Sequence, residues 1–186
     1  RSLPRYLWWL FMVAPKLDGS RLLELTDFPV EEWDVAMHER LIALQKRKQP
    51  GLITPLVSAI TEYIQKESRD LIITDLGAGG MEVDRQVAEW ALKAEYPHTL
   101  TIVAVDKSPV TRRIADKNLK ELVNDVEIIE TGELSTNELE KMRKNATKKI
   151  LIVMCTNDIF GLDQKFGPHY FDLVYHSLFR HHLNPV

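Results

Sequence analysis

The sequence predicts an α/β fold of three layers, in which helices cover both faces of a mostly parallel β-sheet. From Leu71 onward, short apolar runs alternate with amphipathic helical stretches, which is typical of βαβ units. The run Ile150–Cys155 is continuously apolar, as expected for a strand that is covered on both faces. The 186 residues correspond to about one domain. We divide the chain into a helical N-terminal segment, 1–68, and an α/β domain, 69–186.

The N-terminal segment 1–68 is predicted to be helical. Asp27 precedes one apolar stripe of helical spacing, and Thr54 is the predicted cap of a second helix with Pro55 in its first turn. The stripe of the second helix contains Leu56, Val57, Ile60, Tyr63 and Ile64. The apolar run 6–14 is too short to cross a bilayer, so we expect it to pack on the body of the protein or on a second copy. The segment is interpreted as a lid on the substrate side.

Four strands are predicted in the α/β domain, at 71–75, Leu100–Val105, Ile150–Cys155 and 171–176. An amphipathic helix follows the first strand, and a second helix begins after Ser108 as cap, with Pro109 in its first turn.

The third strand is ambiguous. Residues 126–130 alternate like a half-exposed strand, whereas Ile150–Cys155 is continuously apolar. We choose Ile150–Cys155 and interpret 126–130 as part of an insertion, which includes a short charged helix with Ser135 and Glu138 as a capping box.

Composition narrows the classes of function. A net charge of -3 and a pI near 6.1 argue against a protein that binds nucleic acid by neutralising phosphates. The single cysteine, Cys155, has no internal disulfide partner, which favours a reducing compartment, and we expect the protein to be cytoplasmic. Neither a membrane span nor a metal site is expected.

A glycine-rich loop follows the first strand: Asp75-Leu76-Gly77-Ala78-Gly79-Gly80. Glycines allow a tight turn and a close approach of a ligand to the backbone, beside the N-terminus of the next helix. A dinucleotide-binding loop requires a third glycine at the place that Glu82 occupies, and a carboxylate there would repel a pyrophosphate. The loop therefore predicts a nucleotide-like ligand and disfavours NAD.

An acid, Asp106, follows the second strand in Val103-Ala104-Val105-Asp106, where a carboxylate can accept hydrogen bonds from ribose hydroxyls. With these two motifs the sequence resembles the class I S-adenosylmethionine-dependent methyltransferases, from about Leu71 to the end. The resemblance implies a Rossmann-like sheet and an enzyme that transfers a methyl group from S-adenosyl-L-methionine to an oxygen, nitrogen or carbon of a small molecule.

The resemblance also implies individual roles. The acid that opens the glycine motif, Asp75, lies near the methionine moiety; the loop passes beneath the cofactor; Asp106 holds the ribose; and Asn157 and Asp158 contact the adenine. The full set of implied cofactor-binding residues is Asp75, Gly77, Ala78, Gly79, Asp106, Lys107, Asn157, Asp158 and His176.

His181 and His182 are the candidate catalytic residues, because a histidine at the carboxyl end of the strands can take a proton from an acceptor hydroxyl. Methyl transfer to a good nucleophile needs mainly the alignment of donor and acceptor, so a dedicated base is not obligatory.

Two alternatives stay open. One is a non-catalytic, methyltransferase-like protein that assembles through residues 1–14, and the other is an NAD(P)-dependent oxidoreductase. The family's sheet has seven strands, whereas only four are predicted here, so we expect the domain to be incomplete at its C-terminus.

Overall fold

The computed structural model describes residues 53–176. The predicted helix after Asp27, the apolar run 6–14 and the candidate catalytic residues His181 and His182 lie outside the described residues.

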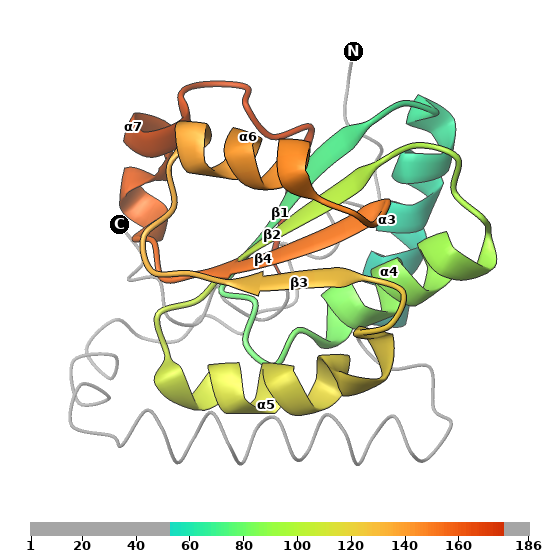
Figure 1. The fold of residues 1–186 in the computed structure, drawn as a ribbon, viewed down its shortest axis with the longest axis horizontal. Helices are drawn as coiled ribbons and strands as arrows, with labels where there is room; N and C mark the ends of the chain where they lie inside the picture. Colours follow the sequence, from blue (N-terminus) through green and yellow to red (C-terminus); the bar gives the residue numbers. More distant parts are fainter. Residues whose placement is uncertain (1–52, 177–186) are drawn as a thin grey trace, which may run out of the picture.

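Five strands form one sheet, and every pair in it is parallel. The strand order is β3-β4-β2-β1-β5 (Figure 1). The strands are β1 (Leu71–Leu76), β2 (Leu100–Val105), β3 (Glu127–Glu130), β4 (Ile150–Cys155) and β5 (Leu173–Tyr175). The chain runs from β1 to β2 on one side and later crosses to β5 on the other side of β1. The predicted Rossmann-like α/β class is confirmed.

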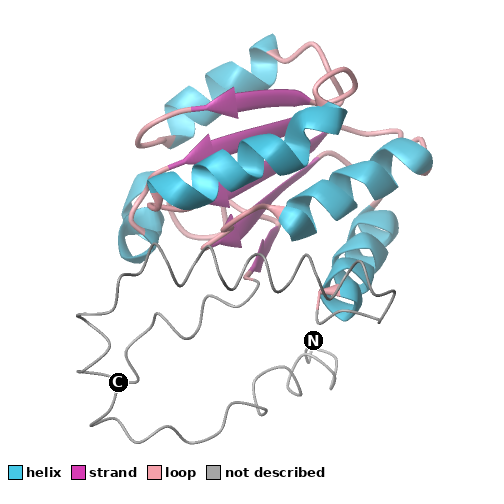
Figure 2. Cartoon of the chain, turned by 90° about the horizontal axis from the view of Figure 1, so that it is seen from below, coloured by secondary structure: helices cyan, strands magenta, loops and turns pink. Residues whose placement is uncertain are grey.

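Helices cover both faces of the sheet, which gives the three predicted layers (Figure 2). One face carries α3 (Thr54–Glu67), α4 (Glu82–Lys93), α5 (Pro109–Leu119) and the short 3-10 helix η2 (Lys120–Leu122). The other carries α6 (Thr136–Asn145), η3 (Ile159–Gly161) and α7 (Leu162–Phe166). Within residues 53–176, no helix is both long enough and apolar enough to cross a membrane.

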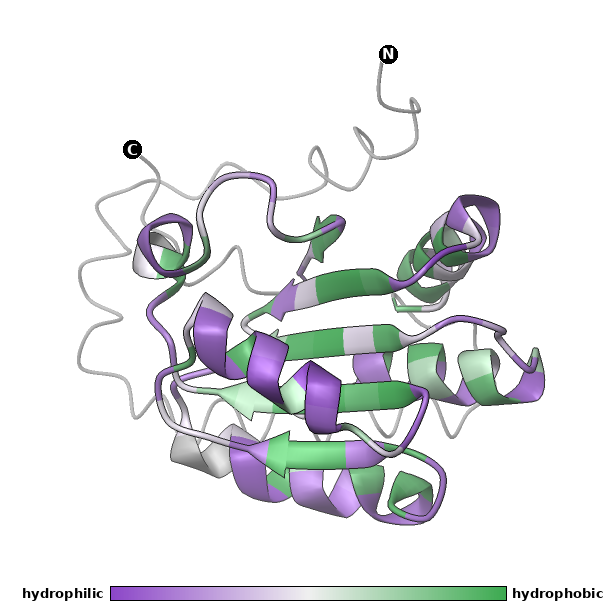
Figure 3. Cartoon of the chain, turned by 45° about the horizontal axis from the view of Figure 1, so that its top comes forward, coloured by the Kyte–Doolittle hydropathy of each residue, from purple (hydrophilic) through white to green (hydrophobic). Residues whose placement is uncertain are grey.

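Two apolar cores follow from the alternation of side chains along the strands. Ile73 of β1 packs toward α3 and α4, whereas its neighbour Ile72 packs toward the α7 side. Strands β2 and β4 are buried along their whole length, as expected for predominantly apolar strands covered on both faces. Figure 3 shows this distribution as apolar strands beneath helices with polar outer surfaces.

The predicted helix starts are largely confirmed. Ser108 caps α5 by accepting a hydrogen bond from the Thr111 N–H, and Ser135 and Glu138 form a reciprocal capping box at α6. The prediction for α3 is wrong by one residue, because Thr54 is already helical and Ile53 occupies the cap position without a side-chain bond.

The interpretation of residues 126–130 as part of an insertion is wrong, since Glu127–Glu130 is a strand of the sheet. It pairs in parallel with β4 from Glu127↔Leu151 to Glu130↔Met154. Its side chains are only partly buried, as expected at an edge, and this explains the alternating sequence pattern. Ile150–Cys155 is therefore the fourth strand along the chain, although it lies directly beside β2.

The strand predicted at 171–176 is shorter in the structure, where it covers Leu173–Tyr175. Asp172, the residue before it, is held by contacts with three other segments. The Asp172 carboxylate accepts a hydrogen bond from the Ile72 N–H at 2.8 Å and pairs with Arg69 at 2.8 Å. The Tyr63 hydroxyl of α3 donates to the Asp172 carbonyl oxygen at 2.9 Å. These contacts join α3, β1 and β5, so α3 of the predicted segment 1–68 packs into the body of the α/β domain.

Candidate functional site

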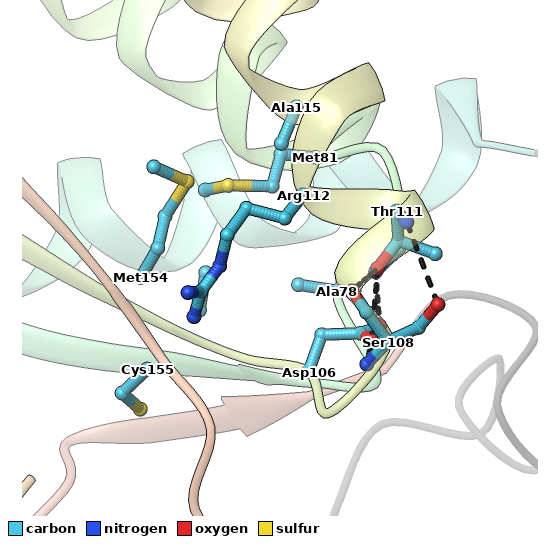
Figure 4. A pocket seen from close by; sticks show the side chains of 11 residues that line it. Ala78, Met81, Asp106, Ser108, Thr111, Arg112, Ala115, Met154 and Cys155 are labelled. Carbon is cyan, nitrogen blue, oxygen red and sulfur yellow. Dashed lines mark hydrogen bonds between the residues drawn. The ribbon is translucent and has the colours of Figure 1, made fainter. Parts of the chain in front are cut away.

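A partly open pocket lies where the carboxyl ends of β2 and β4 meet the glycine loop and the start of α5 (Figure 4). Its empty volume, open solvent at its mouth included, is about 250 Å³. The carboxyl ends of the strands are where open α/β sheets hold their ligands. The lining residues are Ala78, Gly79, Met81, Ala104, Asp106, Ser108, Thr111, Arg112, Ala115, Met154 and Cys155.

The glycine loop forms the pocket wall nearest β1. Gly77 and Gly79 have φ values of 70° and 55°, which side chains disfavour and glycine adopts freely. The N–H groups of Gly77 and Ala78 both donate to the Val105 carbonyl oxygen, at 2.8 and 3.1 Å. The loop is therefore fixed to the end of β2, and its two predicted glycines are needed for that path.

Asp106 connects the two predicted motifs. One carboxylate oxygen, Oδ2, accepts from the Gly79 N–H at 2.8 Å. The other, Oδ1, accepts from the Ser108 N–H at 2.8 Å and from the Thr111 hydroxyl at 2.9 Å. Figure 4 shows Asp106, Ser108 and Thr111 gathered at one side of the pocket. Since a carboxylate offers about four acceptor positions, one position stays open, on Oδ2.

The rest of the pocket is mostly apolar, with Ala78, Met81, Ala104, Ala115 and Met154 contributing methyl and thioether groups. Such a surface suits a flat, weakly polar ring.

Arg112 is a pocket residue that the sequence analysis missed. Figure 4 shows its side chain pointing from α5 into the pocket. Its guanidinium pairs with Glu130 of the edge strand at 2.5 Å and donates to the Thr131 carbonyl oxygen at 3.4 Å. The pocket is thus bounded by an ion pair on the β3 side.

Glu82 is less repulsive than its place in the motif suggests. It opens α4, and its carboxylate pairs with Arg85 at 2.5 Å and accepts from the Gln86 amide at 3.0 Å. Glu82 therefore repels a pyrophosphate less than expected. The loop itself is poorly suited to a pyrophosphate, because the N–H groups of Gly77, Ala78 and Gly79 are all bonded within the protein and do not converge on an anion.

Strand order brings the predicted residues after β2 and β4 to the same edge. Lys107 and Asp158 form an ion pair at 3.0 Å, with both side chains more than half exposed. Asn157 is buried, and its amide exchanges two hydrogen bonds with the Leu134 backbone, at 2.7 and 2.8 Å. The side chain expected to contact adenine is thus used to hold the β3–α6 connection.

Asp75 does not contribute to this pocket. It lies at the end of β1 on the face covered by α4 and is completely buried beside Asp84 and Tyr175. It is not among the residues that line the pocket. Neither of these two neighbours was predicted from the sequence.

The remaining candidates are spread out. His176 is exposed at the end of β5, separated from β4 by β1 and β2.

Burial raises the pKa of the Cys155 thiol to about 11, so the thiol stays protonated near neutral pH and is a poor nucleophile. Among residues 53–176, no three His, Cys, Asp or Glu side chains are grouped to hold a metal ion.

The sequence matches no protein-family model, and searches of curated proteins and of solved structures found no significant match.

Proposed function

We propose that the protein is an S-adenosylmethionine-dependent methyltransferase acting on a small molecule, with its cofactor in the pocket between the glycine loop and α5. One observation carries this proposal. The Gly79 N–H is bonded to the carboxylate of Asp106, so the loop and the strand-end acid that together characterise a nucleoside site border the same pocket.

The chemistry of the pocket fits a nucleoside with a neutral ribose. Asp106 has one acceptor position left for a hydroxyl, and Ala104, Met154 and Ala115 offer an apolar surface for a base. A dinucleotide would instead need loop N–H groups for its pyrophosphate, and three of them are bonded to Val105 and Asp106. These features support S-adenosylmethionine over NAD(P).

The protein's contribution to the reaction would be positioning. S-adenosylmethionine, when bound, supplies a methyl group on a positively charged sulfur, which a nucleophilic atom displaces in line. Asp106 would hold the ribose by a charge-assisted hydrogen bond. The short apolar side chains of the pocket would exclude water from the bound cofactor. The hydrogen bonds to Val105 would hold the backbone of the glycine loop in one conformation.

Calorimetric titration with S-adenosylhomocysteine tests the proposal. We compare the wild type with Asp106→Ala and with Asp116→Ala, which removes an exposed carboxylate of α5 outside the pocket. We expect the wild type and Asp116→Ala to bind equally. Asp106→Ala should bind at least about tenfold more weakly, because a hydrogen bond to a charged group is worth roughly 1.5–3 kcal/mol.

Circular dichroism on each variant confirms folding before binding is compared. Titration with NAD serves as the competing ligand. If the folded wild type does not bind S-adenosylhomocysteine, or binds NAD in its place, the proposal is wrong. Equal binding by Asp106→Ala would show that Asp106 does not hold the ribose.

A further inference from the structure

Two carboxyl groups are enclosed together beneath the glycine loop. Asp75, at the end of β1, and Asp84, in the first turn of α4, each have no exposed surface. Both oxygens of Asp75 and Oδ2 of Asp84 lack a hydrogen-bond partner in the protein when both groups are ionised. The other oxygen of Asp84 accepts from the Tyr175 hydroxyl of β5 at 2.8 Å.

Two ionised carboxylates are not stable in such a place, because burial penalises each charge and the charges repel each other. The other group that acts electrostatically on Asp75 is Asp106, which is also acidic. Between two carboxylates neither side has a proton to donate. A single retained proton removes one charge and turns the contact into a hydrogen bond.

The surroundings decide which residue retains the proton. Burial, then the negative charge of Asp84, raise the pKa of Asp75 well above its usual value. Burial raises the pKa of Asp84 to about 6, while the Tyr175 hydroxyl and the bond from Asp75 favour its ionised form. Burial likewise raises the pKa of Tyr175, which remains a hydroxyl donor. Asp84 thus accepts from both sides, and Asp75 is the donor.

We propose that Asp75 is a positioning residue that works as a neutral carboxylic acid and donates a hydrogen bond to Asp84. This bond joins the two ends of the glycine loop to each other. Because Asp84 also accepts from Tyr175, the bond joins the loop to β5 as well. The loop leaves β1 after Leu76 and enters α4 at Glu82, so Asp75 and Asp84 lie just outside its two ends. The bond therefore closes the loop at its base. Asp75 does not act as a counterion for a cofactor, which separates it from the role that the family resemblance implies.

The retained proton makes folding depend on pH in a defined direction. In the unfolded chain an aspartate loses its proton near pH 3.9. Above that pH the folded state holds more protons than the unfolded state, so the folding equilibrium constant decreases as pH rises. One retained proton corresponds to a tenfold decrease per pH unit between about pH 6, where Asp84 ionises, and the pKa of Asp75.

Carbon-13 NMR on protein labelled at the aspartate carboxyls tests the proposal directly and needs no cofactor. We expect one aspartate to stay protonated in the folded wild type at pH 7 and above. The signal should disappear in Asp75→Asn. The exposed Asp116→Asn is the matched control and should retain it.

Unfolding by urea gives a second readout. The Asp75→Asn variant keeps a donor that does not titrate, so the ratio of the folding constants of wild type and Asp75→Asn should fall by up to tenfold per pH unit above pH 6, for as long as Asp75 stays protonated. If every aspartate of the folded wild type is ionised at pH 7, the proposal is overturned, whether or not Asp75→Asn folds. Failure of S-adenosylhomocysteine to bind would overturn the proposed function alone.

Discussion

Asp75 and Asp106 occupy similar positions in the sequence, at the carboxyl ends of two adjacent strands, yet their surroundings are opposite. Asp75 is enclosed beneath α4 with no N–H or charged donor on its carboxyl group. Asp106 is partly exposed at the pocket and accepts three hydrogen bonds from the protein. We therefore expect a neutral acid at Asp75 and a carboxylate at Asp106.

The strand register explains the difference. Asp75 has the same parity as Leu71 and Ile73, and these side chains face the core under α3 and α4. Asp106 comes directly after the last residue of β2, where the chain has left the sheet and turns toward α5. Two acids at strand ends thus have different chemistry, because one belongs to the core and the other to the rim of the pocket.

The largest stability change is expected for Asp106→Ala. The substitution removes the acceptor for Gly79, Ser108 and Thr111, and at about 1 kcal/mol for each bond the free energy of unfolding should fall by about 3 kcal/mol. Urea denaturation at pH 7 measures this change, with Asp116→Ala as control. A loss as small as that of the control would show that Asp106 does not fix the loop.

Tyr175→Phe should have the next largest effect. It removes the hydroxyl of β5 that donates to the buried Asp84 carboxylate, and the free energy of unfolding should fall by about 2 kcal/mol at pH 8. The loss should be smaller at pH 5, where Asp84 is protonated, because the pKa of this group is about 6. A loss that is the same at both pH values would contradict an ionised Asp84.

Gly79→Ala should cost about 1 kcal/mol, because a side chain at a φ of 55° is strained. The added methyl group would meet the Gly77 carbonyl oxygen at 3.9 Å, an ordinary contact, so the cost comes from the backbone alone. Gly132→Ala, where nothing lies within 4 Å, is the matched control and should leave the thermal midpoint almost unchanged. If Gly79→Ala and Gly132→Ala have equal thermal midpoints, residue 79 does not have the left-handed conformation described here.

Arg112→Met should change stability least, by about 0.5 kcal/mol, because the pair with Glu130 is partly exposed to water. A double-mutant cycle with Glu130→Gln isolates the contribution of the pair. A coupling free energy well above about 1 kcal/mol would mean that the ion pair, rather than the apolar lining, holds β3 against α5.

Local signals in the sequence predicted much of the fold. Ser108 and the Ser135–Glu138 box depend on neighbouring residues, and both caps are present. Residues 126–130 show the limit of this reasoning. Their alternation indicated a half-exposed strand, but the resemblance to a family favoured an insertion, and the structure follows the alternation.

The hydrogen bond between Tyr175 and the buried Asp84 was not predicted, because the two residues are 91 apart in the chain. One local signal was present: Asp84 shares a helical face with Ala88 and Ala91, so an acid lies on the apolar stripe of α4. Arg112 was missed for a similar reason, since its partner Glu130 belongs to the strand that had been assigned to an insertion.

The most direct test of the nucleoside site is to follow backbone N–H signals by NMR while S-adenosylhomocysteine is added to the folded protein. The account predicts that the signals of Gly79, Asp106 and Ser108 shift together and saturate, because these residues border one pocket. Signals that stay unchanged there, or that shift only at positions outside the pocket, would contradict it.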